Sequence, residues 1–116
     1  MRLRDVVSQI FIDPRKLTAY ALDVQNPKGK SKAIMFRQYL GFTSANYQGL
    51  LAQIEAQALN AEAILGKQDE HGQRYQVDML IIGVEPDQQE IVRTGWMVKP
   101  AENLAKLVTL YIPSRK

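Results

Sequence analysis

The chain has 116 residues, a net charge of +3 and no cysteine. This length fits a single domain, residues 1–116, with a core of its own, and the lack of cysteine excludes disulfides and thiolate metal sites. No segment approaches the roughly 20 consecutive apolar residues that a membrane span requires. The N-terminal residues also lack the apolar core of a signal peptide, so we expect a cytoplasmic protein with no membrane partner.

The first expected helix covers residues 12–24. Asp13 is a favourable N-cap, and Pro14 fits the first helical position because its missing N–H is unsatisfied there anyway. The buried face of this helix is expected to carry Leu17, Tyr20, Ala21 and Val24.

The second and third expected helices follow over residues 26–42 and 42–59. Asn26 with Pro27 can open the second helix, or Ser31 can cap a later start, and Gly41 is expected to end it. For the third helix the expected cap is Thr43, with Phe42 and Tyr47 spaced as a hydrophobic staple.

From residue 61 onward the hydrophobic pattern changes from helical to alternating. We expect an edge strand over residues 61–67, then strands over 74–83, 90–98 and 107–112. Helices followed by strands predict an α+β fold, in which about three N-terminal helices pack on one face of a four-stranded antiparallel sheet.

Because side chains alternate along a strand, the strands can be assigned an inner and an outer side. If Val92, Trp96 and Val98 face the helices, Arg93 points away from them. The inner side is then also expected to carry Tyr75, Val77, Met79, Val108, Leu110 and Ile112. The outer side is expected to carry Arg74, Gln76, Asp78, Arg93, Thr109 and Tyr111.

Three lysines, Lys28, Lys30 and Lys32, gather at the start of the second expected helix. The partial positive charge of a helix N-terminus makes each of them unfavourable by about 0.3–1 kcal/mol at low salt. The same helix end, with free N–H groups, suits the docking of a phosphate. A solvated helix end remains the plain alternative.

Several segments, taken in order, resemble an uncharacterised bacterial domain family. The resemblance runs from about Ile12 to Tyr111, and its segments are IDPRKLTAYAL, NPKGKSKAIMF followed by LGFT, DEHGQRYQVD, VRTGW and LVTLY. That family is found as stand-alone small proteins and at the C-terminus of polymorphic toxins and phage-head-associated chains. The resemblance implies a fold similar to the barnase, EndoU, colicin and RelE group of ribonucleases. It also implies metal-independent RNA cleavage without a cofactor, restrained by a small antitoxin-like protein.

The resemblance also implies where the site residues lie. It places catalytic residues at Lys30 or Lys32 on the basic helix, at Arg93 on a middle strand, and at Thr109 and Tyr111 on the last strand. His71 joins this candidate set because an unperturbed imidazole titrates near neutral pH. Lys28 and Arg74 are expected to bind the substrate.

Plainer interpretations stand beside these assignments. Arg93 can pair with Asp78 across the sheet, Thr109 and Tyr111 are favoured strand residues in any case, and His71 fits an ordinary exposed turn. Ser31 stands where the related basic motif often has a histidine, which favours an alternative function as a non-catalytic nucleic-acid- or protein-binding module. A third alternative is a structural subunit that associates through the apolar edge strand.

Overall fold

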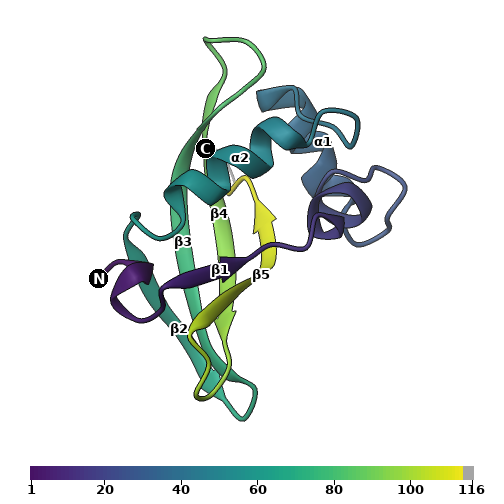
Figure 1. Ribbon diagram of the computed structural model, residues 1–116. Helices are drawn as coiled ribbons and strands as arrows, with labels where there is room; N and C mark the ends of the chain where they lie inside the picture. Colours follow the sequence, from purple (N-terminus) through teal and green to yellow (C-terminus); the bar gives the residue numbers. More distant parts are fainter. Residues whose placement is uncertain (114–116) are drawn as a thin grey trace.

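The computed structural model describes residues 1–113 and shows an α+β fold with one five-stranded mixed sheet (Figure 1). The elements in chain order are η1 (Leu3–Asp5), β1 (Gln9–Phe11), η2 (Leu17–Ala21), α1 (Lys30–Leu40), α2 (Gln48–Gln57), β2 (Ala63–Asp69), β3 (Gly72–Ile82), β4 (Gln89–Val98) and β5 (Leu104–Tyr111). The strand order is β1-β5-β4-β3-β2. None of the helices in the described part of the chain is long and apolar enough to cross a bilayer.

The expectation of four antiparallel strands after the helices is wrong at β1. This strand precedes the helices and runs parallel to β5, with Gln9 opposite Leu104 and Phe11 opposite Lys106. The other neighbouring strands pair antiparallel, as expected. Three residues are too few to show a hydrophobic period, and the partner strand lies at the opposite end of the chain, so the local sequence carries no signal for this pairing.

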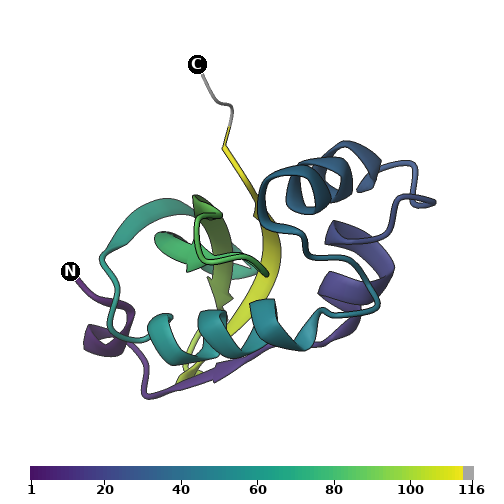
Figure 2. The same ribbon diagram turned by 90° about the horizontal axis from the view of Figure 1, so that it is seen from above.

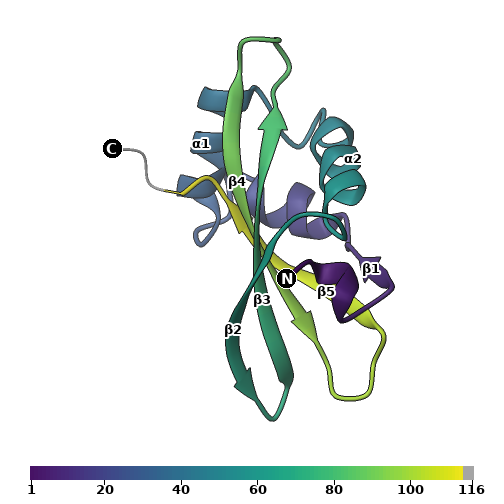
Figure 3. The same cartoon turned by 90° about the vertical axis from the view of Figure 1, so that its left-hand side faces the viewer.

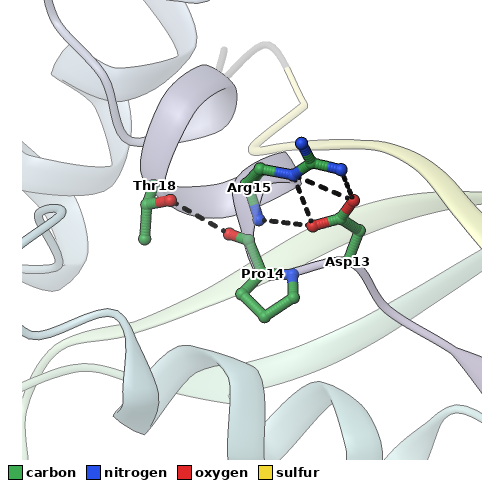
Figure 4. Close-up of polar contacts among 4 residues, drawn as sticks. All are labelled: Asp13, Pro14, Arg15 and Thr18. Carbon is green, nitrogen blue, oxygen red and sulfur yellow. Dashed lines mark hydrogen bonds and ion pairs between the residues drawn. The ribbon is translucent and has the colours of Figure 1, made fainter.

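The first helix is present but shorter than residues 12–24. It consists of η2, a π-helical segment in which Leu22 N donates to the carbonyl of Leu17 at 2.8 Å. Asp13 is not the N-cap of this segment, which is Lys16; it caps the preceding turn instead, where its Oδ1 accepts a hydrogen bond from Arg15 N at 3.0 Å (Figure 4). π-Helical turns are rare and often occur at functional sites.

Neither expected start of the second helix is observed, because the N-cap of α1 is Gly29, with no side-chain cap hydrogen bond. Asn26 instead caps the turn that precedes α1. Its side-chain Oδ1 accepts a hydrogen bond from Lys28 N at 2.9 Å, and α1 begins two residues later. Ser31 is exposed in the first turn and caps nothing. Gly41 ends α1 in the left-handed conformation, with φ of 76°, as its position predicts.

The third helix, α2, covers one face of the sheet (Figures 2 and 3). It begins at Gln48, later than expected, because Thr43 caps a preceding turn instead, accepting a hydrogen bond from Ala45 N at 3.2 Å. Leu50 and Ile54 are buried on its inner side. Figure 3 shows α1 on the other side of the strands from α2, and Figure 2 shows α1 beside the end of β5.

Two glutamines of α2 cover the part of the β3 edge that β2 leaves unpaired. β2 pairs with β3 only as far as Val77. Beyond that point Gln53 donates to the carbonyl of Ile82 at 2.7 Å and accepts from its N–H at 2.8 Å, and Gln57 donates to the carbonyl of Leu80 at 2.9 Å. These side chains replace a neighbouring strand and protect an edge that would otherwise be open to another chain.

The core lies between α2 and the sheet, and the predicted inner residues of β3 and β4 occupy it. Trp96 is only 1% exposed, and its Nε1 donates to Thr94 Oγ1 at 2.8 Å, which in turn donates to the carbonyl of Val77 at 2.6 Å. The buried indole N–H and the buried threonine hydroxyl thus both have a hydrogen-bond acceptor. The other predicted inner residues that are buried are Tyr75, Met79, Val92, Leu110 and Ile112, with Val98 half-buried against them.

The prediction that Val108 faces the core is wrong, because β5 contains a bulge. Gly95 pairs with Thr109 but Trp96 pairs with Leu107, so Val108 is the extra residue. Leu107 and Leu110 are buried, whereas Val108 and Thr109 are both half-exposed. Bulges re-aim side chains in this way, and here the bulge leaves two consecutive side chains out of the core.

Candidate functional site

The face of the sheet opposite α2, here called the open face, carries the predicted polar residues. The pairing places Arg93 opposite Asp78 on one side and Tyr111 on the other, and places Gly95 opposite Thr109. The predicted outward orientation of these side chains on β3, β4 and β5 is therefore confirmed.

Arg93 forms a two-point ion pair with Asp78 on the open face. Its Nε lies 3.0 Å from Asp78 Oδ1, and its Nη2 lies 3.1 Å from Asp78 Oδ2. Both side chains are about one-third exposed. Hydrogen bonding to the Asp78 carboxylate, and secondarily to Tyr111, raises the pKa of Arg93 above its usual value. The guanidinium therefore stays charged at any physiological pH, and the cross-strand ion pair considered from the sequence is present.

Lys32 brings a second positive charge to the open face. Its Nζ donates to the hydroxyl of Tyr20 and, at 3.2 Å, to Thr109 Oγ1. The same ammonium lies 4.6 Å from the centre of the Tyr20 ring and 5.4 Å from that of Tyr111. Because Tyr111 also pairs with Arg93, it connects the two cations across the open face.

A close backbone contact brings Lys32 and Tyr20 together. Gly29, at the N-cap of α1, packs against η2 so tightly that a Cβ there would lie 2.1 Å from the carbonyl oxygen of Tyr20. Only glycine allows this approach. The start of α1 is thereby held against the π-helical turn that carries Tyr20.

Tyr20 has an unusual electrostatic environment for a phenol. Its hydrogen bond with Lys32 is the largest cause of a lowered pKa, with a further contribution from Thr109 and an opposing one from burial. A phenol whose pKa is lowered by a neighbouring ammonium is a better proton acceptor near neutral pH than a free tyrosine. Tyr20 is thus a candidate acid–base group, although the helical period predicts it on the buried face.

The residues Lys32, Tyr20, Thr109, Tyr111 and Arg93 are here called the cluster. A pocket of about 410 Å³ lies next to it, between η2 and the bulge of β5. Its lining residues are Asp13, Arg15, Lys16, Tyr20 and Val108. Arg15 hydrogen-bonds to Asp13 through both its backbone N–H and its guanidinium, and these bonds lower the pKa of Asp13 to about 2.

The remaining predicted site residues are Lys28, Lys30, Arg74 and His71. Lys28 and Lys30 are exposed at the start of α1. Arg74 is exposed on the open face, in a row with Met97 and Lys106.

His71 lies outside the cluster, in the turn between β2 and β3. Its Nε2 is 3.6 Å from Glu70, and its side chain is 72% exposed. The turn is six residues along β3 from Asp78, or about 20 Å at the usual rise of a strand. The structure does not bring His71 together with Lys32 and Arg93.

Three residues of this surface were missed in the sequence. The helical period predicts Tyr20 on a buried face. A buried tyrosine hydroxyl usually needs a polar partner, and this need was the signal in the sequence that a polar group lies nearby. Lys106 was placed in a loop, and Phe11, which is 50% exposed opposite Lys106, lies in the strand that the sequence did not reveal.

No curated protein and no solved structure matches the chain. The comparison with protein families matches residues 2–114 to a domain of unknown function, DUF6883. This match covers almost the whole sequence, including every element described above. The chain therefore belongs to the DUF6883 family.

Proposed function

We propose that this chain is a small toxin-like endoribonuclease that cleaves RNA by attack of the ribose 2′-OH, without a metal ion, and that a partner protein restrains it. The observation that carries the proposal is the meeting of Lys32, Tyr20, Thr109, Tyr111 and Arg93 on the open face. This arrangement places two fixed cations beside two phenols and a hydroxyl on an accessible surface.

The proposed reaction uses these groups in separate roles. The 2′-oxygen attacks phosphorus while the bond to the 5′-oxygen breaks, which gives a 2′,3′-cyclic phosphate and a 5′-hydroxyl. Tyr20, whose pKa is lowered by Lys32, accepts the proton of the 2′-OH. Tyr111 donates a proton to the departing 5′-oxygen, and Thr109 orients Lys32.

Lys32 and Arg93 stabilise the negative charge that develops on the phosphorane. Fixed cations aimed at a developing charge often supply a large part of catalysis. Lys28, Lys30 and Arg74 extend the positive surface beyond the reacting phosphate and hold the flanking backbone. His71, in its distant turn, has no part in this mechanism.

One contact favours a second candidate function, that of a non-catalytic RNA-binding module. The two oxygens of Asp78 already occupy Nε and Nη2 of Arg93, which is one of the faces that would receive a phosphate. In that case RNA binds the open face with strong salt dependence and is released without being cleaved.

Exposed apolar residues beside Arg93 are the basis for proposing a restraining partner protein. Leu80 and Ile91 face each other on the open face, next to the Arg93–Asp78 pair, and are 48% and 45% exposed. Exposed apolar side chains that lie together are typical of protein interaction sites. A protein bound there would cover the cluster.

The test is to incubate the purified chain with total RNA in the presence of a chelator and to identify the new ends. We expect 2′,3′-cyclic phosphates, with cleavage lost in Arg93→Ala and kept in Arg37→Ala, an exposed arginine in the last turn of α1. Salt-sensitive RNA binding with no new ends, at any protein concentration, would support the second candidate instead. Expression of the chain alone should stop bacterial growth, and Arg93→Ala should restore it.

A further inference from the structure

The pocket between η2 and β5 shares one wall with the proposed catalytic cluster. The shared residue is Tyr20, which lines the pocket and whose hydroxyl accepts a hydrogen bond from Lys32. A volume of about 410 Å³ falls within the range of roughly 300–1,000 Å³ that is usual for small-molecule sites. The pocket is therefore large enough to receive one unit of a polymer bound on the open face.

We propose that this pocket binds the nucleobase next to the scissile phosphate, and that it prefers bases with a carbonyl oxygen at position 6 of a purine or position 4 of a pyrimidine, guanine and uracil, over those with an amino group there, adenine and cytosine. The inference rests on the proposed function, because it takes RNA as the ligand. It concerns binding alone, however, and is tested by binding.

The apolar part of the pocket suits the flat face of a base. Val108 is available there because the bulge of β5 keeps it out of the core. Tyr20 and Lys16 line the same pocket, and both have an apolar part, an aromatic ring and a methylene stem. Aromatic and aliphatic side chains of this kind stack on any base, so they supply affinity and no base preference.

The polar part of the pocket is dominated by hydrogen-bond donors. Arg15 Nε lies 3.1 Å from both carboxylate oxygens of Asp13, and Arg15 Nη2 lies 2.7 Å from Asp13 Oδ2 (Figure 4). These bonds occupy Nε and one N–H of Nη2, on a side chain that is 82% exposed. Within residues 1–113 no hydrogen bond occupies the N–H groups of Nη1 or the second N–H of Nη2, so these groups can donate to a ligand.

Free guanidinium donors select for acceptors on the base. Guanine offers O6 and N7, and uracil offers O4, whereas adenine and cytosine present an amino group at the corresponding position. An amino group facing Arg15 would bring two donors together and leave both unsatisfied. This is the source of the expected preference.

Lys16 and Lys32 lie on the two sides that a bound nucleotide would connect. Among residues 1–113 the side chain of Lys16 makes no hydrogen bond or ion pair, so its ammonium is available to a phosphate. Lys32 is connected to the pocket through Tyr20, to whose hydroxyl its ammonium donates a hydrogen bond. A base in the pocket would thus place its phosphate toward the proposed catalytic cluster.

The test is a titration of the full chain with the four nucleoside 3′-monophosphates and with inorganic phosphate, followed by calorimetry and by amide chemical shifts. We expect GMP and UMP to bind at least about fivefold tighter than AMP and CMP, as one good base contact implies. Every nucleotide should bind tighter than phosphate. The amides of Arg15, Tyr20 and Val108 should shift with nucleotides.

Two variants and a control locate the effect. Arg15→Lys keeps the charge but loses the planar fork, so the preference for GMP and UMP should disappear while phosphate binding remains. Val108→Trp fills the pocket and should bring all four nucleotides to the affinity of phosphate. Arg37→Lys should leave every affinity unchanged, and circular dichroism checks that each variant folds.

Equal binding of the four nucleotides by the wild-type chain, or nucleotides no tighter than phosphate, would overturn the inference. The result of this binding test can be distinguished from the result of the RNA-cleavage test. If GMP and UMP are preferred but RNA is not cleaved, the pocket stands and the nuclease proposal falls. If RNA is cleaved and no base is preferred, the nuclease proposal stands and the pocket assignment falls.

Discussion

Lys32 and Tyr20 come from separate helical segments and meet at the rim of the open face, where Lys32 Nζ lies 4.6 Å from the centre of the Tyr20 ring and donates to its hydroxyl. The ammonium therefore stabilises the ionised phenol and at the same time points toward the sheet, where it reaches Thr109. One lysine of the basic cluster thus has a defined position, whereas Lys28 and Lys30 remain exposed.

The first prediction compares two lysines of the same helix turn. Lys32→Met should reduce RNA cleavage by about 100-fold or more, the loss expected on removing one fixed charge from a transition state. Lys30→Met makes the same change in net charge at an exposed position and should reduce cleavage only slightly. The measurement is the rate under single-turnover conditions. Equal losses in the two variants would mean that only the overall charge matters.

The second prediction concerns the pH dependence of cleavage. If Tyr20 is the base, the rate should rise with pH and level off at a pKa below 10, the ordinary value for tyrosine, since Lys32 lowers it. In Tyr20→Phe this rise should disappear. Tyr47→Phe, a half-buried tyrosine before α2, should keep the wild-type profile. A rise that persists in Tyr20→Phe assigns the base to another group.

The third prediction tests what Asp78 does to Arg93. Asp78→Asn removes the carboxylate that occupies two guanidinium nitrogens, so RNA binding should tighten by several-fold at low salt. Asp87→Asn changes the net charge equally in an exposed part of the β3–β4 connection and should tighten binding less. Affinities are read at two salt concentrations. No difference between the two variants would show that Arg93 does not contact the RNA.

The fourth prediction concerns the contact between α1 and η2. Gly29→Ala places a methyl group 2.1 Å from the carbonyl oxygen of Tyr20. Backbone must move to relieve this overlap, and overpacking of this kind costs about 1–3 kcal/mol in the free energy of unfolding. Gly66→Ala, in β2, meets no atom closer than 3.3 Å and should cost less. Urea denaturation measures both, and cleavage by Gly29→Ala should fall as Lys32 is displaced.

The fifth prediction follows from the low pKa of Asp13. Its folded value is about 2, against an ordinary value of 3.8, because Arg15 stabilises the carboxylate. Its contribution to stability is therefore fully present above the ordinary pKa and is lost as the pH falls through the folded one. The difference in unfolding free energy between wild type and Asp13→Asn should be constant above about pH 5 and should shrink between about pH 5 and pH 1. A constant difference down to pH 2 would contradict the assigned role of Arg15.

The strands β3 and β4 were predictable because they contain their own signal. Alternation over ten residues of β4 places Trp96 in the core and Arg93 on the opposite side without reference to any other part of the chain. The C-terminal end of α1 was predictable for the same reason, because Gly41 adopts the left-handed conformation that ends a helix. Capping and alternation are local effects.

The candidate site was only partly predictable. Thr109 and Tyr111 were placed on the correct face although Val108 was not, since a single bulged residue shifts the alternation of β5. Nothing in the sequence shows where that extra residue lies, because its position depends on how β5 pairs with β4. The pocket that Val108 lines could not be foreseen for the same reason.

Hydrophobic periods and caps within a few residues were enough to predict the two faces of β3 and β4 and the end of α1, since these are local effects. The contacts of Tyr20 with Lys32, of β1 with β5, and of Asp78 with Arg93 become visible only in the folded chain. These contacts join segments far apart in the chain. They depend on strand register and on the close approach at Gly29, which are settled by how the whole core packs.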